Sequence, residues 1–97
     1  MAAYALSLVE VTDPDTFSDY VDAVRPIVER HGGRYVTIGA VADVLEGSPG
    51  PGSVVLIRFD DIAAARRWYR SDDYQAIAPI RHRSARTTVI LFEDQGG

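Results

Sequence analysis

The most concentrated group of potentially reactive side chains in this sequence is the segment Arg81-His82-Arg83, which Arg86 follows closely. It is a cluster of positive charge on a chain whose formal net charge is −4. A planar guanidinium can bind a carboxylate, enolate or phosphate through two parallel hydrogen bonds, and an imidazole can transfer a proton near neutral pH. We therefore expect Arg81 to bind an acidic group of a small ligand and His82 to be a candidate base. The alternative is a solvated surface segment.

The second histidine, His31, lies at the end of an apolar helical stripe and directly before Gly32-Gly33. There it is a helix cap that interacts favourably with the helix dipole, a buried histidine with satisfied hydrogen bonds, or a second candidate base. Tyr74 precedes Arg81 by seven positions, so the two would share a face if one helix ran through both. Pro79 stands between them and argues against a continuous helix.

Aromatic side chains offer walls for an apolar binding site. Trp68 follows helical spacing, Tyr20 lies on the stripe that ends at His31, and Tyr35 begins a strand-like segment. Such residues most often complete a core between a helix and a sheet. They are also what a pocket for a planar ligand requires, so Trp68, Tyr20, Tyr35 and Tyr74 join Arg81 as candidate ligand-binding residues.

The composition removes several classes of chemistry. The chain has no cysteine, which excludes thiolate nucleophiles, disulfides and cysteine-ligated metal centres. All ten basic residues are arginine, so no lysine can form a Schiff base. The two histidines lack the spacing of a metal-binding helix motif, and we expect neither a metal nor a cofactor.

The charge balance and the apolar runs also limit the partners. An excess of acidic residues disfavours binding to nucleic acid or to an anionic membrane surface. No apolar run approaches the roughly 20 residues of a membrane span, and the N-terminus lacks a basic secretory region. By default we expect a cytoplasmic protein.

Hydrophobic periodicity and turn residues divide the 97 residues into strands and helices in the order β-α-β-β-α-β. Asp13 and Pro14 begin the first helix, in which we expect Pro26 to produce a kink. The second helix follows Asp60-Asp61 and is predicted in two pieces, the second ending at Pro79. Strands are predicted at residues 4–11, 34–39, 54–59 and 87–93, with the second continuing as 41–46 beyond a bend.

This order is typical of a ferredoxin-like α+β fold with a four-stranded antiparallel sheet and both helices on one face. The strand Val54-Val55-Leu56-Ile57 is apolar on both faces, and so is the last strand. Since two helices cover only one face, the other would expose a large apolar surface. The pattern therefore predicts a homodimer that joins through the sheet faces.

The sequence also resembles a known family over nearly its whole length. The segments that carry the resemblance are V-E-V-T-D-P-D-T-F at 9–17, H-G-G-R-Y at 31–35, V-L-E-G at 44–47, R-F-D-D-I-A-A-A-R-R-W-Y-R-S-D-D-Y at 58–74 and I-R-H-R-S-A at 80–85. They are similar to domain-of-unknown-function family 1330, within the dimeric α/β-barrel superfamily. The resemblance implies two ferredoxin-like subunits with their sheets face to face and a cleft between sheet and helices in each. It also places an arginine at the position of Arg81.

We therefore expect one domain spanning residues 1–97, assembled as a dimeric α/β barrel. Its predicted function is to bind a small anionic or aromatic metabolite in the cleft. Related families of the superfamily imply an alternative, a cofactor-independent monooxygenase or isomerase with His31 or His82 as base. A further alternative is a non-catalytic dimerisation or assembly module.

Overall fold

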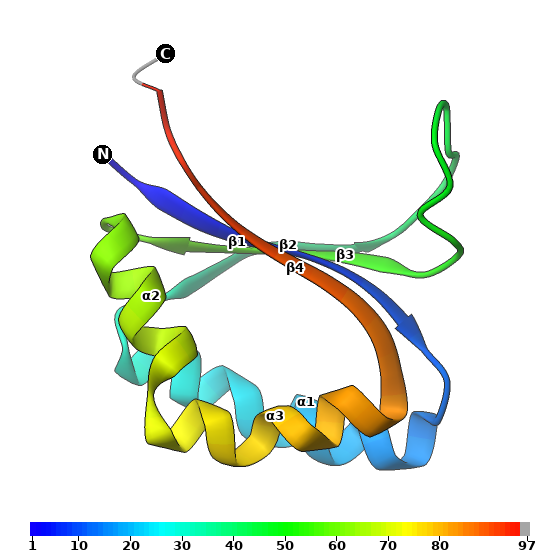
Figure 1. Ribbon diagram of the computed structural model, residues 1–97, viewed down its shortest axis with the longest axis horizontal. Helices are drawn as coiled ribbons and strands as arrows, with labels where there is room; N and C mark the ends of the chain where they lie inside the picture. Colours follow the sequence, from blue (N-terminus) through cyan, green and yellow to red (C-terminus); the bar gives the residue numbers. More distant parts are fainter. Residues whose placement is uncertain (96–97) are drawn as a thin grey trace.

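The computed structural model describes residues 1–95 and places four strands and three helices in them. The strands form one antiparallel sheet in the order β2-β3-β1-β4, and the helices lie on one side of it (Figure 1). This confirms the predicted ferredoxin-like α+β fold, including the break in the second helix. The elements are β1 (Ala3–Val11), α1 (Pro14–Arg30), β2 (Arg34–Ala40), β3 (Ser53–Phe59), α2 (Ile62–Arg70), α3 (Asp72–Ser84) and β4 (Ala85–Glu93).

A side-chain cap fixes where α1 begins, and backbone hydrogen bonds followed by a glycine fix where it ends. The Asp13 carboxylate accepts hydrogen bonds from the Thr16 backbone N–H at 3.3 Å and from the Thr16 hydroxyl at 2.7 Å. Pro14 occupies the first turn, where its missing N–H costs nothing. After α1, Gly32 has φ of 81°, a conformation that glycine adopts without strain. The capping signals in the sequence therefore predicted this helix correctly.

The helix α3 runs through Pro79, so the prediction that Pro79 ends it is wrong. A proline in a helix frees the carbonyl four residues earlier, here that of Gln75. Both Pro79 and Gln75 are exposed, so water can bond to that carbonyl. Burial of Tyr74, Ala78 and Arg81 on the opposite side holds the helix together. Tyr74 and Arg81 consequently share one face.

The predicted continuation of the second strand over 41–46 is also wrong. The strand β2 ends at Ala40, which pairs with Ser53 at the start of β3. The Val41 N–H still donates to the Gly52 carbonyl at 2.9 Å, but residues 41–52 belong to no strand and form a loop that projects away from the helices (Figure 1). An alternating apolar pattern alone does not produce a strand where no neighbouring strand pairs with the backbone.

Each strand divides its side chains between a helix side and an open side. Ala5 pairs with Ile57 and Leu91 on the helix side, and Leu6 pairs with Leu56 and Ile90 on the open side. We call the open side the open face, and it carries Tyr4, Leu6, Leu8, Val54, Leu56, Ile90 and Phe92. The buried core lies on the helix side, where Phe59, Trp68 and Tyr74 pack with the apolar faces of α1 and α3.

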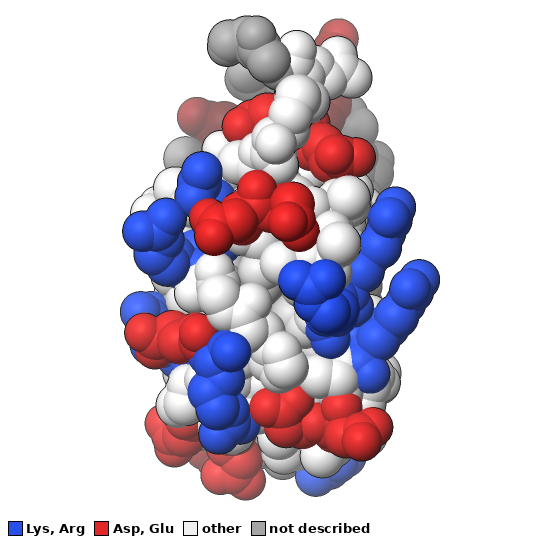
Figure 2. Space-filling view, turned by 90° about the vertical axis from the view of Figure 1, so that its left-hand side faces the viewer, with Lys and Arg blue, Asp and Glu red and all other residues white. Residues whose placement is uncertain are grey.

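The end of the molecule covered by α2 carries arginine and acidic side chains in alternation, and neither sign forms a continuous patch on it (Figure 2). Within residues 1–95, no helix is long and apolar enough to cross a membrane.

Candidate functional site

A cavity of about 250 Å³ lies between the sheet and the helices, and we call it the helix-side cavity. The central strand β1 contributes the small side chain of Ser7 to its wall, followed by Val9 and Val11. The helix α1 packs mainly against α3 and makes few contacts to the sheet. The residues that line it are Ser7, Val9, Val11, Phe17, Tyr20, Val21, Val24, Arg25, Tyr35, Ile38, Ser53, Val55, Ile57, Trp68, Tyr74 and Arg81.

Two tyrosine hydroxyls meet in this cavity. The Tyr20 and Tyr74 hydroxyl oxygens are 2.9 Å apart, and either can donate to the other. Burial raises the pKa of Tyr20 well above its usual range, and the nearby Tyr74 ring and hydroxyl add to this effect. The Tyr20 hydroxyl therefore stays protonated at physiological pH. Because one hydroxyl hydrogen serves the bond between them, the other remains to be donated to a ligand oxygen.

The buried cation of the cavity is Arg81, which is only 5% exposed. One terminal nitrogen donates to the Thr87 hydroxyl, and the other donates to His82 Nε2 at 3.2 Å. Neither partner is an acid, and within the described residues no carboxylate lies within ion-pair distance of Arg81. A buried charge without a counter-ion is costly, so an acidic ligand would stabilise this arrangement.

Two buried hydrogen-bond donors lack a partner in the described part of the chain, and both belong to residues of this cavity. They are the Arg81 Nε–H and the Trp68 Nε1–H. Buried polar groups are normally satisfied, so each unpaired one calls for an explanation. Both groups can only donate, which matches a ligand that presents acceptor oxygens.

The outer part of the cavity contains a second cation. The Arg25 guanidinium carbon lies 4.3 Å from the centre of the Tyr35 ring, in a cation–π contact. Burial raises the pKa of Tyr35 to about 12, although the Arg25 charge acts in the opposite direction. No aspartate or glutamate appears among the described residues that line the cavity, although the chain as a whole is acidic.

Neither histidine lines the helix-side cavity. His31 turns toward α3, where its Nε2 is 3.0 Å from the Asp73 carboxylate. His82 is exposed and touches the outer side of the Arg81 guanidinium. Because arginine can only donate, His82 Nε2 is the acceptor in this contact.

The five ligand-binding candidates from the sequence come together in one place. Arg81, Tyr74, Trp68, Tyr35 and Tyr20 all line the helix-side cavity. Sequence reasoning missed Arg25, Ser7 and Ser53. Arg25 lies off the apolar stripe of its helix, and nothing in its spacing sets it apart from a solvated residue. Ser7 did carry a signal, since it is a small polar residue within an apolar strand.

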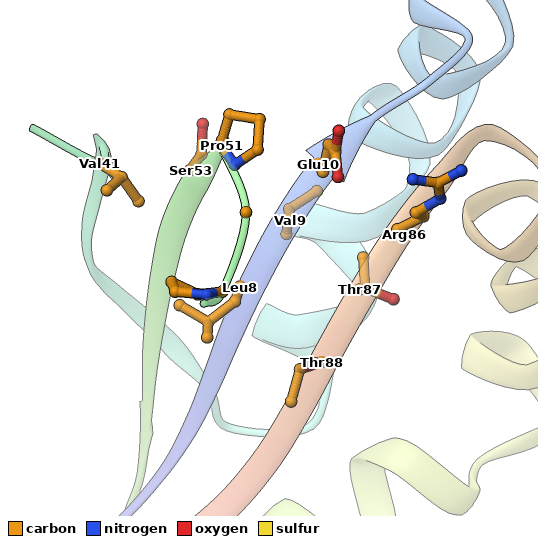
Figure 3. A pocket seen from close by; sticks show the side chains of 12 residues that line it. Leu8, Val9, Glu10, Val41, Pro51, Ser53, Arg86, Thr87 and Thr88 are labelled. Atoms are coloured by element: carbon orange, nitrogen blue, oxygen red, sulfur yellow. The ribbon is translucent and has the colours of Figure 1, made fainter. Parts of the chain in front are cut away.

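A smaller cavity of about 170 Å³ lies beside the loop before β3, on the side away from the helices. Figure 3 shows Glu10 on β1 and Arg86 on β4 at this pocket, and the two are partners in the strand register. Pro51 from the loop forms part of its wall. Within residues 1–95, no group of three or more histidine, aspartate or glutamate residues could hold a metal ion.

Solved structures show the same fold in other proteins. RPA0582, a protein of unknown function from Rhodopseudomonas palustris, superposes with a TM-score of 0.79 at 19% identity, covering 99% of this chain and 84% of that one. SnoaB, a cofactor-independent oxygenase from Streptomyces nogalater, gives 0.68 at 16% identity, over 99% and 95% of the two chains. A dimeric ferredoxin-like protein of unknown function from Thermobifida fusca gives 0.67 at 18% identity, over 97% and 92%.

At these identities the likeness shows the fold alone. No curated protein matches the chain in sequence. The model of the family described as Domain of unknown function (DUF1330) matches residues 2–95, and the chain therefore belongs to this family, as the sequence resemblance predicted.

Proposed function

We propose that this protein binds a small metabolite with an acidic group on a planar, apolar body, in the helix-side cavity. The observation that carries the proposal is that two unpartnered buried donors, Arg81 Nε–H and Trp68 Nε1–H, belong to residues that line that one cavity. A carboxylate or enolate oxygen would satisfy Arg81 and supply its missing counter-ion.

The remaining groups of the cavity suit the rest of such a ligand. The Trp68 and Tyr74 rings lie with their centres 4.6 Å apart and form an aromatic wall. The Tyr20 and Tyr74 hydroxyls can donate to a second oxygen, because Tyr20 remains protonated. Val24, Val55 and Ile57 offer apolar contact. Most of the binding free energy would come from this contact, and the donors would orient the ligand.

The same proposal includes a homodimer through the open face. Ile90 and Phe92 on the edge strand β4 are 48% and 41% exposed, and they extend the apolar surface that Leu6 and Leu56 form on the two central strands. Covering such a patch with a second copy removes it from water. The ferredoxin-like neighbour from Thermobifida fusca is described as dimeric, which supports this assembly.

The catalytic alternative is a narrower candidate. The similarity of fold to SnoaB, a cofactor-independent oxygenase, favours it. A reaction of that kind needs a base that reaches the ligand, and here His82 touches Arg81 from outside while His31 binds Asp73. Binding requires no such base, and the geometry therefore supports binding better than catalysis. The open cavity also favours binding over a role in assembly alone.

The test is the substitution Arg81→Met, assayed by isothermal titration with benzoate and 4-hydroxybenzoate. Methionine keeps the apolar length of the side chain and removes the charge. We expect affinity to fall about 10- to 100-fold, because hydrogen bonds to a charged group contribute about 1.5–3 kcal/mol. The melting temperature without ligand should stay the same or rise, since a buried uncompensated cation is removed.

Arg83→Met is the matched control, because Arg83 is an exposed arginine two positions along the same helix. It should bind both probes as the unmodified protein does. Equal affinity of the Arg81→Met and unmodified proteins, or no binding of either probe by the unmodified protein, would contradict the proposed function.

A further inference from the structure

From the second cation of the helix-side cavity, we propose that the ligand carries two acidic groups, one at each end of its apolar body, and that Arg25 binds the outer one. The inference rests on the proposed function and extends it to a ligand class, a small planar di-acid. Arg25 then determines specificity between di-acids and mono-acids.

A contact with Tyr35 positions the Arg25 side chain. Its guanidinium lies over the Tyr35 ring, and Tyr35 is a half-buried member of the same cavity wall. Stacking orients the guanidinium plane and leaves its N–H groups free to donate at the edge. Within residues 1–95, no carboxylate forms an ion pair with Arg25. Arg25 is therefore oriented without being neutralised.

The two cations lie at different levels of the cavity. The contact of His31 near the end of α1 with Asp73 near the start of α3 shows that the two helices run antiparallel. Arg81, in the last turn of α3, therefore lies toward the first turns of α1, near Tyr20. Arg25 is five positions beyond Tyr20, which corresponds to about 7.5 Å along the helix at about 1.5 Å per residue.

The surface between these two levels is apolar and aromatic. Tyr20 and Val24 line it from α1, Trp68 belongs to the same cavity wall, and no acidic side chain is among the described lining residues. A mono-acid bound to Arg81 would leave the exposed Arg25 guanidinium to water, whereas a rigid di-acid of matching length would bind both cations. A cavity with two arginines on a chain of net charge −4 is consistent with selection for a dianion.

The experiment compares terephthalate with benzoate, two probes that differ only in the second carboxylate. For the unmodified protein we expect terephthalate to bind about five- to tenfold more tightly, the value of one additional charge-assisted hydrogen bond at a partly exposed site. Arg25→Met should remove this preference, so that the two probes bind with equal affinity. Arg25→Lys should restore it only in part, because lysine lacks the planar, stacked geometry.

Arg66→Met is the control, since Arg66 is an exposed arginine on α2 and does not line the cavity. It should retain the full preference for terephthalate. Equal affinity of the unmodified protein for the two probes would overturn the two-acid inference and leave the proposed function standing. Loss of affinity for both probes alike in Arg25→Met would also overturn it. Failure of the proposed function has a different result, in which neither probe binds or Arg81→Met has no effect.

Discussion

The central strand β1 presents small residues to the helices, namely Ala3, Ala5 and Ser7, whereas its open side presents Tyr4 and Leu6. The helix side is covered, and yet it contains a cavity of about 250 Å³. The open face is uncovered, and yet large apolar side chains fill it, with the Tyr4 and Phe92 rings stacked 5.2 Å apart. The face that the helices cover is thus incompletely filled, whereas the uncovered face is filled with large apolar side chains.

Under the proposed function, this difference assigns two tasks to one small sheet. A covered face with missing volume and two unpaired donors is suited to hold a ligand. A filled apolar face without a cover is suited to associate with another protein surface. Because neighbouring side chains on a strand point to opposite faces, substitutions one position apart should affect one task and spare the other.

The largest effect is expected on the open face, from Ile90→Glu. In the separate subunit this side chain is 48% exposed, so the carboxylate remains hydrated and the fold is retained. In the proposed dimer it would be buried without a partner, at a cost of about 3–5 kcal/mol. We expect the dimer dissociation constant to rise at least about 100-fold, measured by analytical ultracentrifugation.

Ile90→Val keeps an apolar group at the same position and should leave the dimer intact. Binding of benzoate to the Ile90→Glu protein should persist, since Ile90 does not line the helix-side cavity. A dimer unaffected by Ile90→Glu would show that association uses another surface. The role proposed for the open face would then be wrong.

A smaller effect is expected on the helix side, from Ser7→Leu. Ser7 lines the cavity from the central strand, and its backbone pairs with Val55 and Val89. Leucine would occupy volume that a ligand needs, without the strain of overpacking a filled core. We expect about a tenfold loss of affinity for benzoate by titration calorimetry, with thermal stability unchanged or increased.

Ser7→Ala serves as the control for loss of the hydroxyl and should bind normally. Retention of full affinity by Ser7→Leu would show that the ligand does not use the space above β1. The dimer should be unaffected in both variants, because position 7 faces away from the open face.

Local signals in the sequence were sufficient for most of the fold. Asp13 and Asp61 cap their helices through local hydrogen bonds, and Pro14 follows Asp13 in the first turn. Both helices begin where these residues predicted. Pro79 misled because the cost of an interior proline depends on whether water reaches the freed carbonyl, which is a property of the folded surface. The segment 41–46 misled because a strand needs a partner that no local pattern specifies.

The part of the candidate site that could be predicted consists of reactive or aromatic side chains that lie on the buried face of their own helix. Tyr74 and Arg81 were paired by their spacing, and the continuous α3 places both in the cavity. Arg25 was not predictable, because its environment is created by Tyr35 on another element. Tertiary contacts of this kind appear only after the chain has folded.

The smallest expected effect concerns the helix layer alone, at the contact that joins α1 to α3. Asp73 accepts from His31 and from Arg30, each at 3.0 Å. The Ser71 hydroxyl, followed by the His31 ring and the Arg30 guanidinium, holds the pKa of Asp73 well below its ordinary value of 3.8. The folded state therefore binds fewer protons here than the unfolded state does. The resulting stabilisation is complete above about pH 5 and is lost as the pH falls through and below the unfolded value.

We expect Asp73→Asn to lower the melting temperature slightly at neutral pH and to reduce its decline between about pH 5 and pH 3, measured by circular dichroism. Asp72→Asn is the matched control, because it removes a neighbouring negative charge from the same first turn of α3. The melting temperature of the Asp72→Asn protein should fall with decreasing pH as steeply as that of the unmodified protein. If the melting temperature of the Asp73→Asn protein fell with decreasing pH as steeply as that of the unmodified protein, the contact of Asp73 with His31 and Arg30 would contribute nothing to the loss of stability in acid. Affinity for benzoate and the dimer should not change, since Asp73 belongs neither to the cavity wall nor to the open face.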